Sequence, residues 1–439
     1  MSRRLILLVS CAVLACGAAM VGCGGDDDEG GGGGSASSGE SGTTAGAKVI
    51  DVKSMDAAKG DVTYCTGKDT SGDLKEGLKK FNTEFGADGL KAKILEFPTS
   101  ADEQRNQFVQ RQRAKSGDCD VFEADVIWTA EFATQKWLYD LTPYIESRKA
   151  EFIPSTLTSV TYDKKMWGAP RVTDSGLLFY RTDKVDAVPQ TWQDVYQQAA
   201  SEGGIVYQGA PYEGLTVDFL ELAYAAGGKV LSADGSKAEF DNPNNLKALK
   251  FMVDGIKNGS APKSVTTFME EEARRSFENG KPAFMRNWPY AYALGNDAPK
   301  VKGKFEVAPY PSFEGAGKAG ILGGHNAVIS VYSKNPGGAL KLVDYMTSDE
   351  RITRNAIKYS KAPPLASVYE DPAVKKALPF AAELKQGVEQ AKTRPVSQVY
   401  SQISQAIYKN VNEALTGAQT PEQALKNGQA EMEKALQTF

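Results

Sequence analysis

Aromatic residues stand next to carboxylates or amides in three short segments of the sequence. The segments are Asp-Val-Ile-Trp-Thr-Ala-Glu at 125–131, Tyr-Glu-Gly at 212–214 and Asn-Trp-Pro-Tyr at 287–290. Carboxylates and amides hydrogen-bond hydroxyl groups, while aromatic faces cover the apolar C–H faces of a sugar ring. Together the segments favour a site for a hydroxyl-rich small molecule, although a single Trp or Tyr is more often part of a core.

The scarcity of histidine restricts the catalytic chemistry that the chain can carry. Its 439 residues include one histidine, His325, which argues against His-ligated metals, histidine bases and Ser-His triads. Paired carboxylates and tryptophans also build glycoside hydrolase sites, where two acids stand about 5–9 Å apart. A secreted carbohydrate-active hydrolase is therefore the alternative to a binding protein. We predict neither a cofactor nor a bound metal.

Composition is that of a globular protein with a small acidic excess. The chain is 41% hydrophobic and has a formal net charge of −4. Its length is sufficient for two ordinary domains. Because the sequence has no basic stripe or basic tail, we predict no nucleic-acid partner.

Strand and helix patterns alternate in the first third of the chain. Strands are expected at 62–65, 91–97 and 121–127. Apolar residues at helical spacing follow the first strand over 74–85, and Ser100 with Glu103 indicates a capping box before a second helix. This order predicts a parallel sheet covered on both faces. The turns 66–69 and 125–131 then fall at the carboxyl ends of strands, where such sheets bind ligands.

A second α/β unit follows. Further strands are expected at 176–180, 305–309 and 325–332. Thr191 is the expected N-cap of a helix, another helix is expected at 336–348, and the last hundred residues are expected to be mostly helical.

The N-terminus has the pattern of a processing segment. Two arginines precede an apolar run at 5–21, and polar sequence begins directly after Cys23. We predict a lipoprotein signal peptide at 1–22 and lipidation of Cys23, because the apolar run continues past the rival Cys16. A plain signal peptide with incidental cysteines is the alternative. Residues 23–47 are mostly small and polar and are predicted to form a flexible tether.

After cleavage, Cys65 and Cys119 are the cysteines that remain besides the anchor. Two thiols in an oxidising compartment are more often bridged than free, so we predict a disulfide. It would stabilise the fold by about 3–4 kcal/mol. A simple parallel pairing, with one cysteine at a strand end and the other at a strand start, would hold the two thiols apart.

From about residue 60 onward the sequence resembles the family 1 extracellular solute-binding proteins, the group that contains maltose- and trehalose/maltose-binding proteins. The segments that carry the resemblance are 65–69 (CTGKD), 125–133 (DVIWTAEFA), 137–142 (WLYDLT), 176–181 (GLLFYR), 189–192 (PQTW), 287–290 (NWPY), the Gly323–Gly324 pair and 394–396 (RPV). As a set they are specific for the family and much less specific for the sugar.

The resemblance implies an α/β, two-lobe periplasmic-binding-protein-like fold of type II, whose hinged lobes close on a ligand. Lobe I would comprise 48–171 and 308–361, and lobe II 172–307 and 362–439. The implied function is non-catalytic. A lipid-anchored monomer at the extracellular face, exported by the Sec or Tat route, would capture a maltose- or trehalose-like oligosaccharide for the permease subunits of an ABC transporter. A different polyol, or an amino or oxidised sugar, is the alternative ligand.

The same resemblance implies a set of ligand-binding residues. Asp125 would accept hydrogen bonds from hydroxyl groups, with a helix N-cap as its alternative role. Asp174 would stand where the chain crosses between lobes, with a plain hinge turn as its alternative. Trp288 and Tyr290 would form the stacking pair of the second lobe, with Tyr212 as a weaker candidate.

Five further candidates complete the set. Gly323 and Gly324 would form a turn whose backbone faces the ligand. His325 follows where many trehalose/maltose relatives have Trp, which removes a stacking face and leaves the identity of the sugar open. Arg394 would reach into the cleft, with a surface salt bridge as its alternative role, and Asp69 is a weaker candidate.

Overall fold

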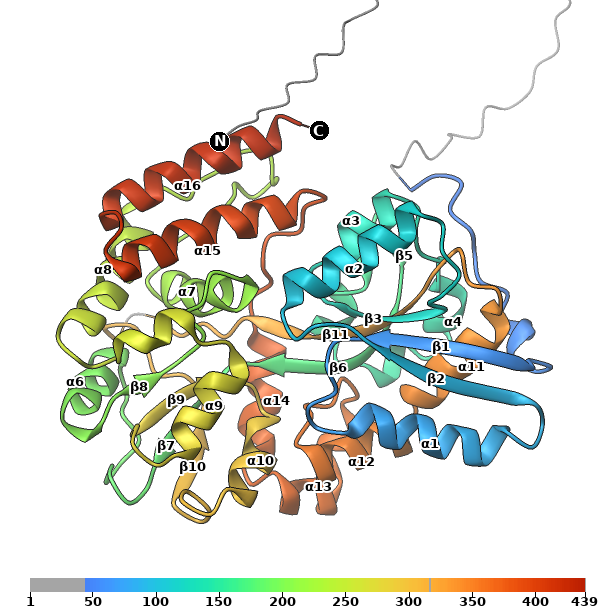
Figure 1. Cartoon of the computed structure of the whole chain (residues 1–439), viewed down its shortest axis with the longest axis horizontal. Coiled ribbons are helices and arrows are strands. Elements are labelled where there is room, and N and C mark those ends of the chain that lie inside the picture. Colours follow the sequence, from blue (N-terminus) through green and yellow to red (C-terminus); the bar gives the residue numbers. More distant parts are fainter. Residues whose placement is uncertain (1–43, 316, 439) are drawn as a thin grey trace, which may run out of the picture. The chain divides into compact units, whose positions relative to one another are not determined.

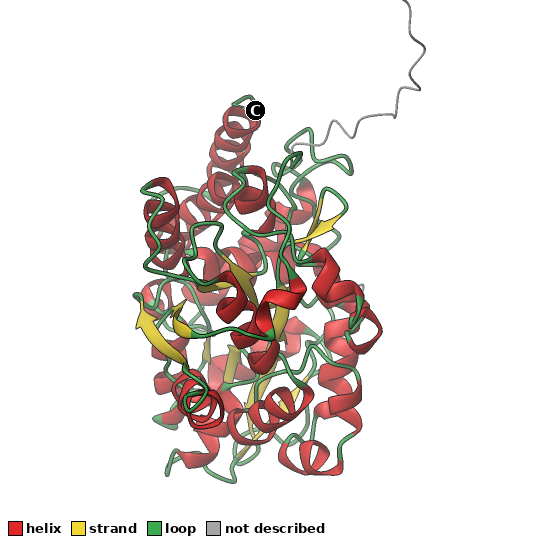
Figure 2. Ribbon diagram, turned by 90° about the vertical axis from the view of Figure 1, so that its right-hand side faces the viewer, coloured by secondary structure: helices red, strands yellow, loops and turns green. Residues whose placement is uncertain are grey.

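The computed structural model describes residues 44–315 and 317–438, which form a mixed α/β fold. The strands form a five-stranded sheet, a four-stranded sheet and a hairpin of β4 (Thr161–Tyr162) and β5 (Lys165–Met166). Helices surround the strands (Figure 1; Figure 2). The predicted signal peptide, Cys16, Cys23 and the tether up to residue 43 lie outside the described residues. The last four residues of the predicted tether, 44–47, are not free of the fold, because Thr44 is buried and its hydroxyl donates to Asp163 Oδ2 at 2.6 Å.

The first sheet has the strand order β2-β1-β3-β11-β6. Its strands are β1 (Gly60–Thr66), β2 (Leu90–Glu96), β3 (Val121–Asp125), β6 (Ala169–Ser175) and β11 (Leu322–Ile329). β1 is parallel to β2 and β3, as the strand–helix alternation predicts. β11 enters from far along the chain and runs antiparallel to β3 and β6. The start of β11 therefore lies beside the carboxyl end of β3.

β11 begins three residues before the predicted strand. Gly323, Gly324 and His325 consequently lie inside a strand and not in a turn, so that expectation was wrong. Gly324 has a φ of +112°, and a side chain there would meet the backbone of Val172 and Thr173 in β6. A glycine at this position permits both the dihedral angle and the close approach of the two strands.

Helices cover both faces of the first sheet, because alternate residues of its strands point to opposite sides. On one face, α1 (Asp73–Phe85) and α11 (Pro336–Met346) bury Phe81 and Leu340 in one cluster. On the other face, α2 (Ala101–Arg113) and α3 (Thr129–Thr134) bury Phe108 and Phe132, whose ring centroids are 4.7 Å apart.

Ser100 caps α2 as predicted, by accepting the Glu103 N–H at 3.5 Å. The return hydrogen bond from the Glu103 side chain, which would complete a capping box, is not among the hydrogen bonds of the described residues.

The structure contains the predicted disulfide between Cys65 in β1 and Cys119 just before β3. The Cα atoms of the two cysteines are 5.8 Å apart. The separation expected of a simple parallel pairing does not arise, because the Asp120 N–H donates to the carbonyl of Thr63 at 3.0 Å. This bond holds the segment before β3 alongside β1.

The second sheet has the strand order β10-β7-β9-β8. Its strands are β7 (Leu177–Arg181), β8 (Ile205–Val206), β9 (Phe284–Asn287) and β10 (Phe305–Ala308). β7 is antiparallel to β9 and β10, and β8 is parallel to β9. The chain passes from the first sheet to the second at Gly176, between β6 and β7. Asp174 lies beside this crossing.

Helices of the second half pack around this sheet in a cluster of their own. They include α6 (Trp192–Glu202), α7 (Glu213–Ala225), α8 (Pro243–Lys257), α9 (Glu270–Glu278) and α10 (Ala291–Asp297). Thr191 caps α6 as predicted, accepting the Asp194 N–H at 3.1 Å.

The last hundred residues are largely helical, in agreement with the sequence pattern. Their helices are α12 (Asp349–Tyr359), η4 (Ser367–Glu370), α13 (Pro372–Ala377), α14 (Ala381–Gln390), α15 (Tyr400–Thr416) and α16 (Pro421–Leu436). Shorter elements elsewhere are η1 (Val52–Met55), α4 (Thr142–Glu146), η2 (Lys149–Glu151), α5 (Pro154–Thr158) and η3 (Lys263–Thr267).

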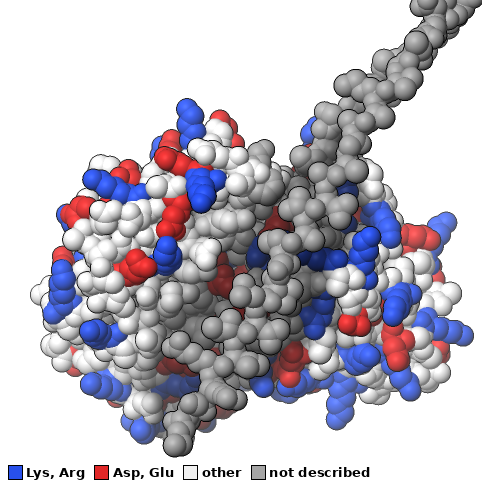
Figure 3. Space-filling model, turned by 45° about the horizontal axis from the view of Figure 1, so that its top comes forward, with Lys and Arg blue, Asp and Glu red and all other residues white. Residues whose placement is uncertain are grey.

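Charges of both signs share the surface. On the face seen in Figure 3, Lys and Arg side chains are interspersed with Asp and Glu side chains. The sequence has a similar near-balance, with 51 basic and 55 acidic residues. Among residues 44–315 and 317–438, no helix combines the length and the apolar character needed to cross a membrane.

Candidate functional site

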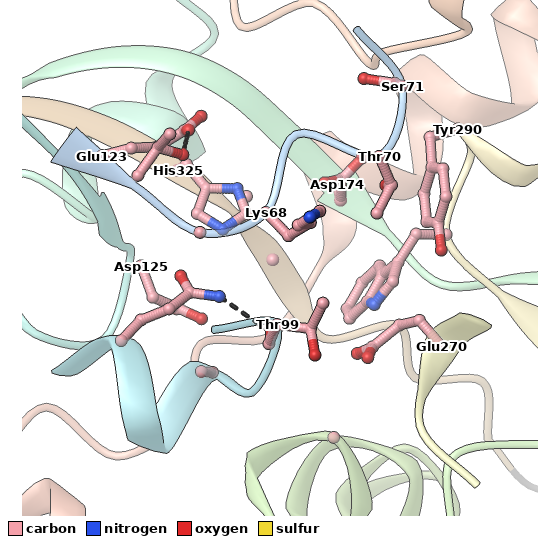
Figure 4. Close-up of a pocket in the computed structure, with 18 of the residues that line it drawn as sticks. Lys68, Thr70, Ser71, Thr99, Glu123, Asp125, Asp174, Glu270, Tyr290 and His325 are labelled. Carbon is pink, nitrogen blue, oxygen red and sulfur yellow. Dashed lines mark hydrogen bonds between the residues drawn. The ribbon is translucent and has the colours of Figure 1, made fainter. Parts of the chain in front are cut away.

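A cavity of about 210 Å³ is lined from both halves of the fold. Its wall includes the loops after β1 and β2, parts of β3, β6 and β11, the start of α7 and the segment after β9. Every ligand-binding residue predicted from the sequence lines it, namely Asp69, Asp125, Asp174, Tyr212, Trp288, Tyr290, Gly323, Gly324, His325 and Arg394. In Figure 4, Asp125 and His325 lie on one side of the cavity and Tyr290 and Glu270 on the other. Contact of these residues with a ligand stays a prediction.

Asp174 presents its carboxylate to this cavity. None of the hydrogen bonds of the described residues reaches it, and burial raises its pKa to about 7. Asp125 adds to the shift, whereas Lys361 and Arg171 oppose it. A hydroxyl group that donates to this carboxylate would replace the water lost on burial and stabilise its charged form.

Arg394 joins the two sides of the cavity wall. It donates to Asp125 Oδ1 and to the carbonyl of Leu322, both at 3.2 Å, and to Glu213 Oε1 at 2.7 Å. The Arg394 side chain is 3% exposed, so its ion pairs are buried and the surface salt bridge considered from the sequence is wrong. Asp125 also accepts the Ile127 N–H at 3.2 Å and does not cap α3, whose N-cap residue is Trp128.

Glu213, which belongs to the 212–214 segment but is not among the predicted ligand-binding residues, completes this chain of contacts. Its carboxylate accepts hydrogen bonds from the Tyr400 hydroxyl at 2.6 Å and the Ser404 hydroxyl at 2.5 Å as well as from Arg394. Burial raises the pKa of Glu213 to about 7. Its neighbour Tyr212 was selected, and the 212–214 segment proves to be a helix start.

Trp288 supplies the aromatic part of the wall. The guanidinium of Arg286 lies 4.1 Å from the centroid of its ring, a cation–π arrangement. A Cβ atom at Gly323 would lie 2.8 Å from two carbons of this ring. The glycine therefore allows Trp288, which follows the second sheet, to approach β11 of the first.

The two tyrosines have different surroundings. The Tyr290 hydroxyl donates to Glu271 Oε1 at 2.7 Å, and the Lys361 ammonium lies 5.4 Å from the centroid of the Tyr290 ring. Tyr212 is buried, and burial together with the charge of Glu270 raises the pKa of its hydroxyl.

Asp69 and His325 line the cavity, and their surroundings limit what each can offer to a ligand. The Asp69 carboxylate accepts the N–H groups of Gly72 at 2.8 Å and Lys75 at 3.0 Å, which stabilises the start of α1. Burial lowers the pKa of His325 against the opposing charge of Glu123, so the imidazole is neutral near pH 7.

Sequence reasoning also missed a buried cluster that lines the cavity. Arg171 donates to Glu123 Oε1 and to Asp73 Oδ2, each at 2.8 Å. The three residues come from β6, β3 and the start of α1, and no local pattern connects them.

Lys68 and Lys361 line the cavity too, and neither belongs to an ion pair in the part of the chain that the structure describes. The sequence could have identified Lys68, because this residue belongs to the 65–69 segment that carries the family resemblance.

The residues of the 125–131 segment lie in different environments of the folded chain. Of the residues at 125–131, Asp125 lines the cavity, whereas Trp128 is buried in the core, 6.1 Å from the ring of Phe108 between centroids. Glu131 forms an ion pair with Arg105. The aromatic residue next to an acid in sequence is here a core residue.

Comparisons with known proteins place these features in one family. Residues 68–351 match the family model of the bacterial extracellular solute-binding proteins. A probable ABC transporter-binding protein of Deinococcus radiodurans is 36% identical over 360 residues, 77% of this chain and 85% of that protein.

Two solved structures share the fold over most of their length. T. maritima MalE3 with maltose bound has a TM-score of 0.81 and 38% identity, covering 85% of this chain and 99% of that one. A solute-binding protein of Thermotoga lettingae with α-D-tagatose bound has a TM-score of 0.79 and 27% identity, covering 86% and 100%. The two sheets with their helices thus form the two lobes of a periplasmic-binding-protein-like fold, and the chain belongs to the bacterial extracellular solute-binding proteins.

Proposed function

We propose that this chain is the extracellular substrate-binding subunit of an ABC transporter, and that it captures a maltose- or trehalose-like oligosaccharide for the membrane permease. One observation carries the proposal. The carboxylate of Asp174, which has no hydrogen-bond partner among the described residues, and the indole of Trp288, which packs on Arg286, line the same cavity. A hydrogen-bond acceptor near an aromatic face suits a sugar ring, which has hydroxyl edges and apolar faces. The maltose-bound relative supports this choice of ligand.

Titration calorimetry with maltose and trehalose tests the ligand. Binding of either disaccharide, weakened in Asp174→Asn and in Trp288→Ala, is the expected result. The tagatose-bound relative makes a monosaccharide or another polyol the competing ligand, so tagatose, mannitol and ribitol belong in the same series. Absence of binding to every one of these sugars and polyols would refute the proposed ligand class.

The proposed role includes no catalysis. Among the described residues, eight carboxylates line the cavity: Asp69, Asp73, Glu123, Asp125, Asp174, Glu213, Glu270 and Glu271. Several are occupied by Arg171, by Arg394 or by backbone N–H groups. Such pairing leaves fewer free acids for a hydrolytic mechanism, which needs two. A reducing-sugar assay with maltose and trehalose should show no release of glucose, and measurable turnover would favour the hydrolase alternative.

We further propose that Cys23 carries the lipid and that a tether of about 20 residues, 23–43, spaces the folded part about 23–27 Å from the membrane. Cys23→Ser should release the protein from membranes, whereas Cys16→Ser should leave it anchored. The opposite pattern would assign the anchor to Cys16.

In this proposal the protein acts as a monomer, with lobe I at 48–175 and 308–361 and lobe II at 176–307 and 362–439. The boundary expected after residue 171 moves to Gly176, because 172–175 pair with β11 in the first sheet. Neither lobe alone holds a complete site, since Asp125 and Trp288 come from different sheets. The lobes should therefore close on the sugar. Small-angle scattering should give a smaller radius of gyration with saturating ligand than without it.

A further inference from the structure

Helix α7 begins beside the cavity without a cap from its own N-cap residue. Tyr212, at that position, makes no side-chain hydrogen bond to the helix. The N–H of Glu213, the first residue of α7, donates instead to Asp102 Oδ2 at 3.0 Å. Asp102 lies in the first turn of α2 and precedes Glu213 by 111 positions in the chain. The acceptor for this helix end is thus supplied by a distant segment.

The two helices belong to different lobes. α2 buries Phe108 and Val109 in the cluster against the first sheet. α7 buries Leu215 and Phe219 in the cluster around the second sheet. The bond from Glu213 to Asp102 therefore crosses from one lobe to the other. Asp102 itself does not line the cavity, although Ala101 and Gln104 of the same helix do.

We propose that Asp102 is a positioning residue, which caps α7 across the cleft and holds the two lobes together. The first N–H groups of a helix have no partner inside the helix, and the helix dipole favours a carboxylate beside them. When the lobes separate, the Glu213 N–H loses this acceptor. The closed arrangement is therefore favoured by the free energy of one helix cap.

The capped turn also carries one of the cavity's charged contacts. The Glu213 carboxylate accepts a hydrogen bond from Arg394, and Arg394 also donates to Asp125 on the first lobe. The carboxylate of Asp102 also lies close enough to Tyr408 of α15, which packs against the cluster of the second lobe, for its charge to act on the Tyr408 hydroxyl. Burial, followed by the charge of Asp102, raises the pKa of the Tyr408 hydroxyl. Asp102 therefore interacts with two residues of the second lobe, Glu213 and Tyr408.

Asp102→Ala tests this role, with Glu103→Ala as the matched control. Glu103 is an exposed acid in the same first turn of α2, so both changes remove one charge near the same helix end. Hydrogen exchange of the Glu213 amide should be faster in Asp102→Ala than in wild type, and small-angle scattering should give a larger radius of gyration. Glu103→Ala should match wild type in both measurements. Asp102→Asn, which keeps an acceptor oxygen but loses the charge, should lie between them.

The expected effect on ligand affinity rests on the proposed function. The Kd for maltose should rise about 2- to 30-fold in Asp102→Ala, the range of a lost helix cap, mainly through faster dissociation. If wild type binds none of the tested sugars, the proposed ligand is wrong, and exchange and scattering of the ligand-free protein still decide the role of Asp102. The inference is overturned if Asp102→Ala equals Glu103→Ala in exchange and compaction, both with and without maltose.

Discussion

Each half of the fold holds a buried arginine that lies between two carboxylates at or near the cavity wall. The groups are Arg171 with Asp73 and Glu123, and Arg286 with Asp218 and Glu221. Every side chain in them is at most 6% exposed. Isolated buried charges are strongly unfavourable, so each group persists because its charges are paired and hydrogen-bonded.

The two groups differ in what they present to the cavity. Arg171, Asp73 and Glu123 line it directly, whereas Arg286 and its partners do not. Arg286 lies instead against the ring of Trp288, which does line the cavity. The Arg171 group therefore offers charge and hydrogen bonds to the cavity, whereas the Arg286 group lies outside it and supports the aromatic face of Trp288. Similar ion-pair chemistry thus serves two different surfaces.

The largest effect that we predict from this comparison is a loss of stability when Arg286 is replaced. Arg286→Met would leave Asp218 and Glu221 buried without their cation, and loss of one partner of a buried pair costs about 3–5 kcal/mol. Arg171→Met should cost less, because Lys361 continues to stabilise the charge of Asp73. Urea unfolding followed by circular dichroism measures both free energies of unfolding. The prediction is contradicted if Arg171→Met lowers the free energy of unfolding as much as Arg286→Met does, or more.

The charged half should also give the protein a specific pH dependence. Burial raises the pKa of Asp174 to about 7, whereas an unfolded Asp titrates near about 3.9. The folded state therefore binds this proton more tightly, and the free energy of unfolding rises as the pH falls through about 7 toward about 4. Relative to Asp174→Asn, the ligand-free wild type should gain about 2–3 kcal/mol between about pH 8 and about pH 5. Unfolding both proteins at the two pH values tests this, and a constant difference would contradict it.

The aromatic half should contribute through contact area. Trp288→Ala is expected to cost about 1–3 kcal/mol of ligand binding, a loss of about 5- to 150-fold in affinity. Trp288→Phe keeps a ring and should lose less. Calorimetry with the sugar that binds wild type most tightly measures both variants. Equal affinity in Trp288→Ala and wild type would mean that the ring belongs to the wall without touching the ligand.

The smallest effect is expected at the point where the two halves meet. In Gly323→Ala the new methyl group would lie 2.8 Å from two carbons of the Trp288 ring, so the ring must shift. Small overpacking of this kind costs about 1 kcal/mol, or a several-fold loss of affinity. Gly387→Ala is the control, because its Cβ would make ordinary contacts at 3.4 Å with Ser175. If the two variants bind sugar equally well, Trp288 does not depend on Gly323 for its position.

Local patterns account for much of the fold. Apolar spacing predicted α1, and Ser100 and Thr191 cap their helices as expected. Helix periodicity and capping depend on residues within a few positions of one another, so a single sequence displays them. The position of β11 was predicted less well. Its glycines are placed by pairing with β3 and β6, strands that lie far away in the chain.

The candidate site divides in the same way. The sequence alone, through its aromatic and acidic segments and its resemblance to a family, determined which stretches of chain converge on the cavity. Tertiary structure alone decided that Trp128 enters the core, that Arg171 joins the wall, that Glu213 pairs with Arg394, and that Asp102 caps a helix of the other lobe. Ion pairs and caps between distant segments have no sequence period. Their partners are chosen by the packing of the two lobes, which no local pattern records.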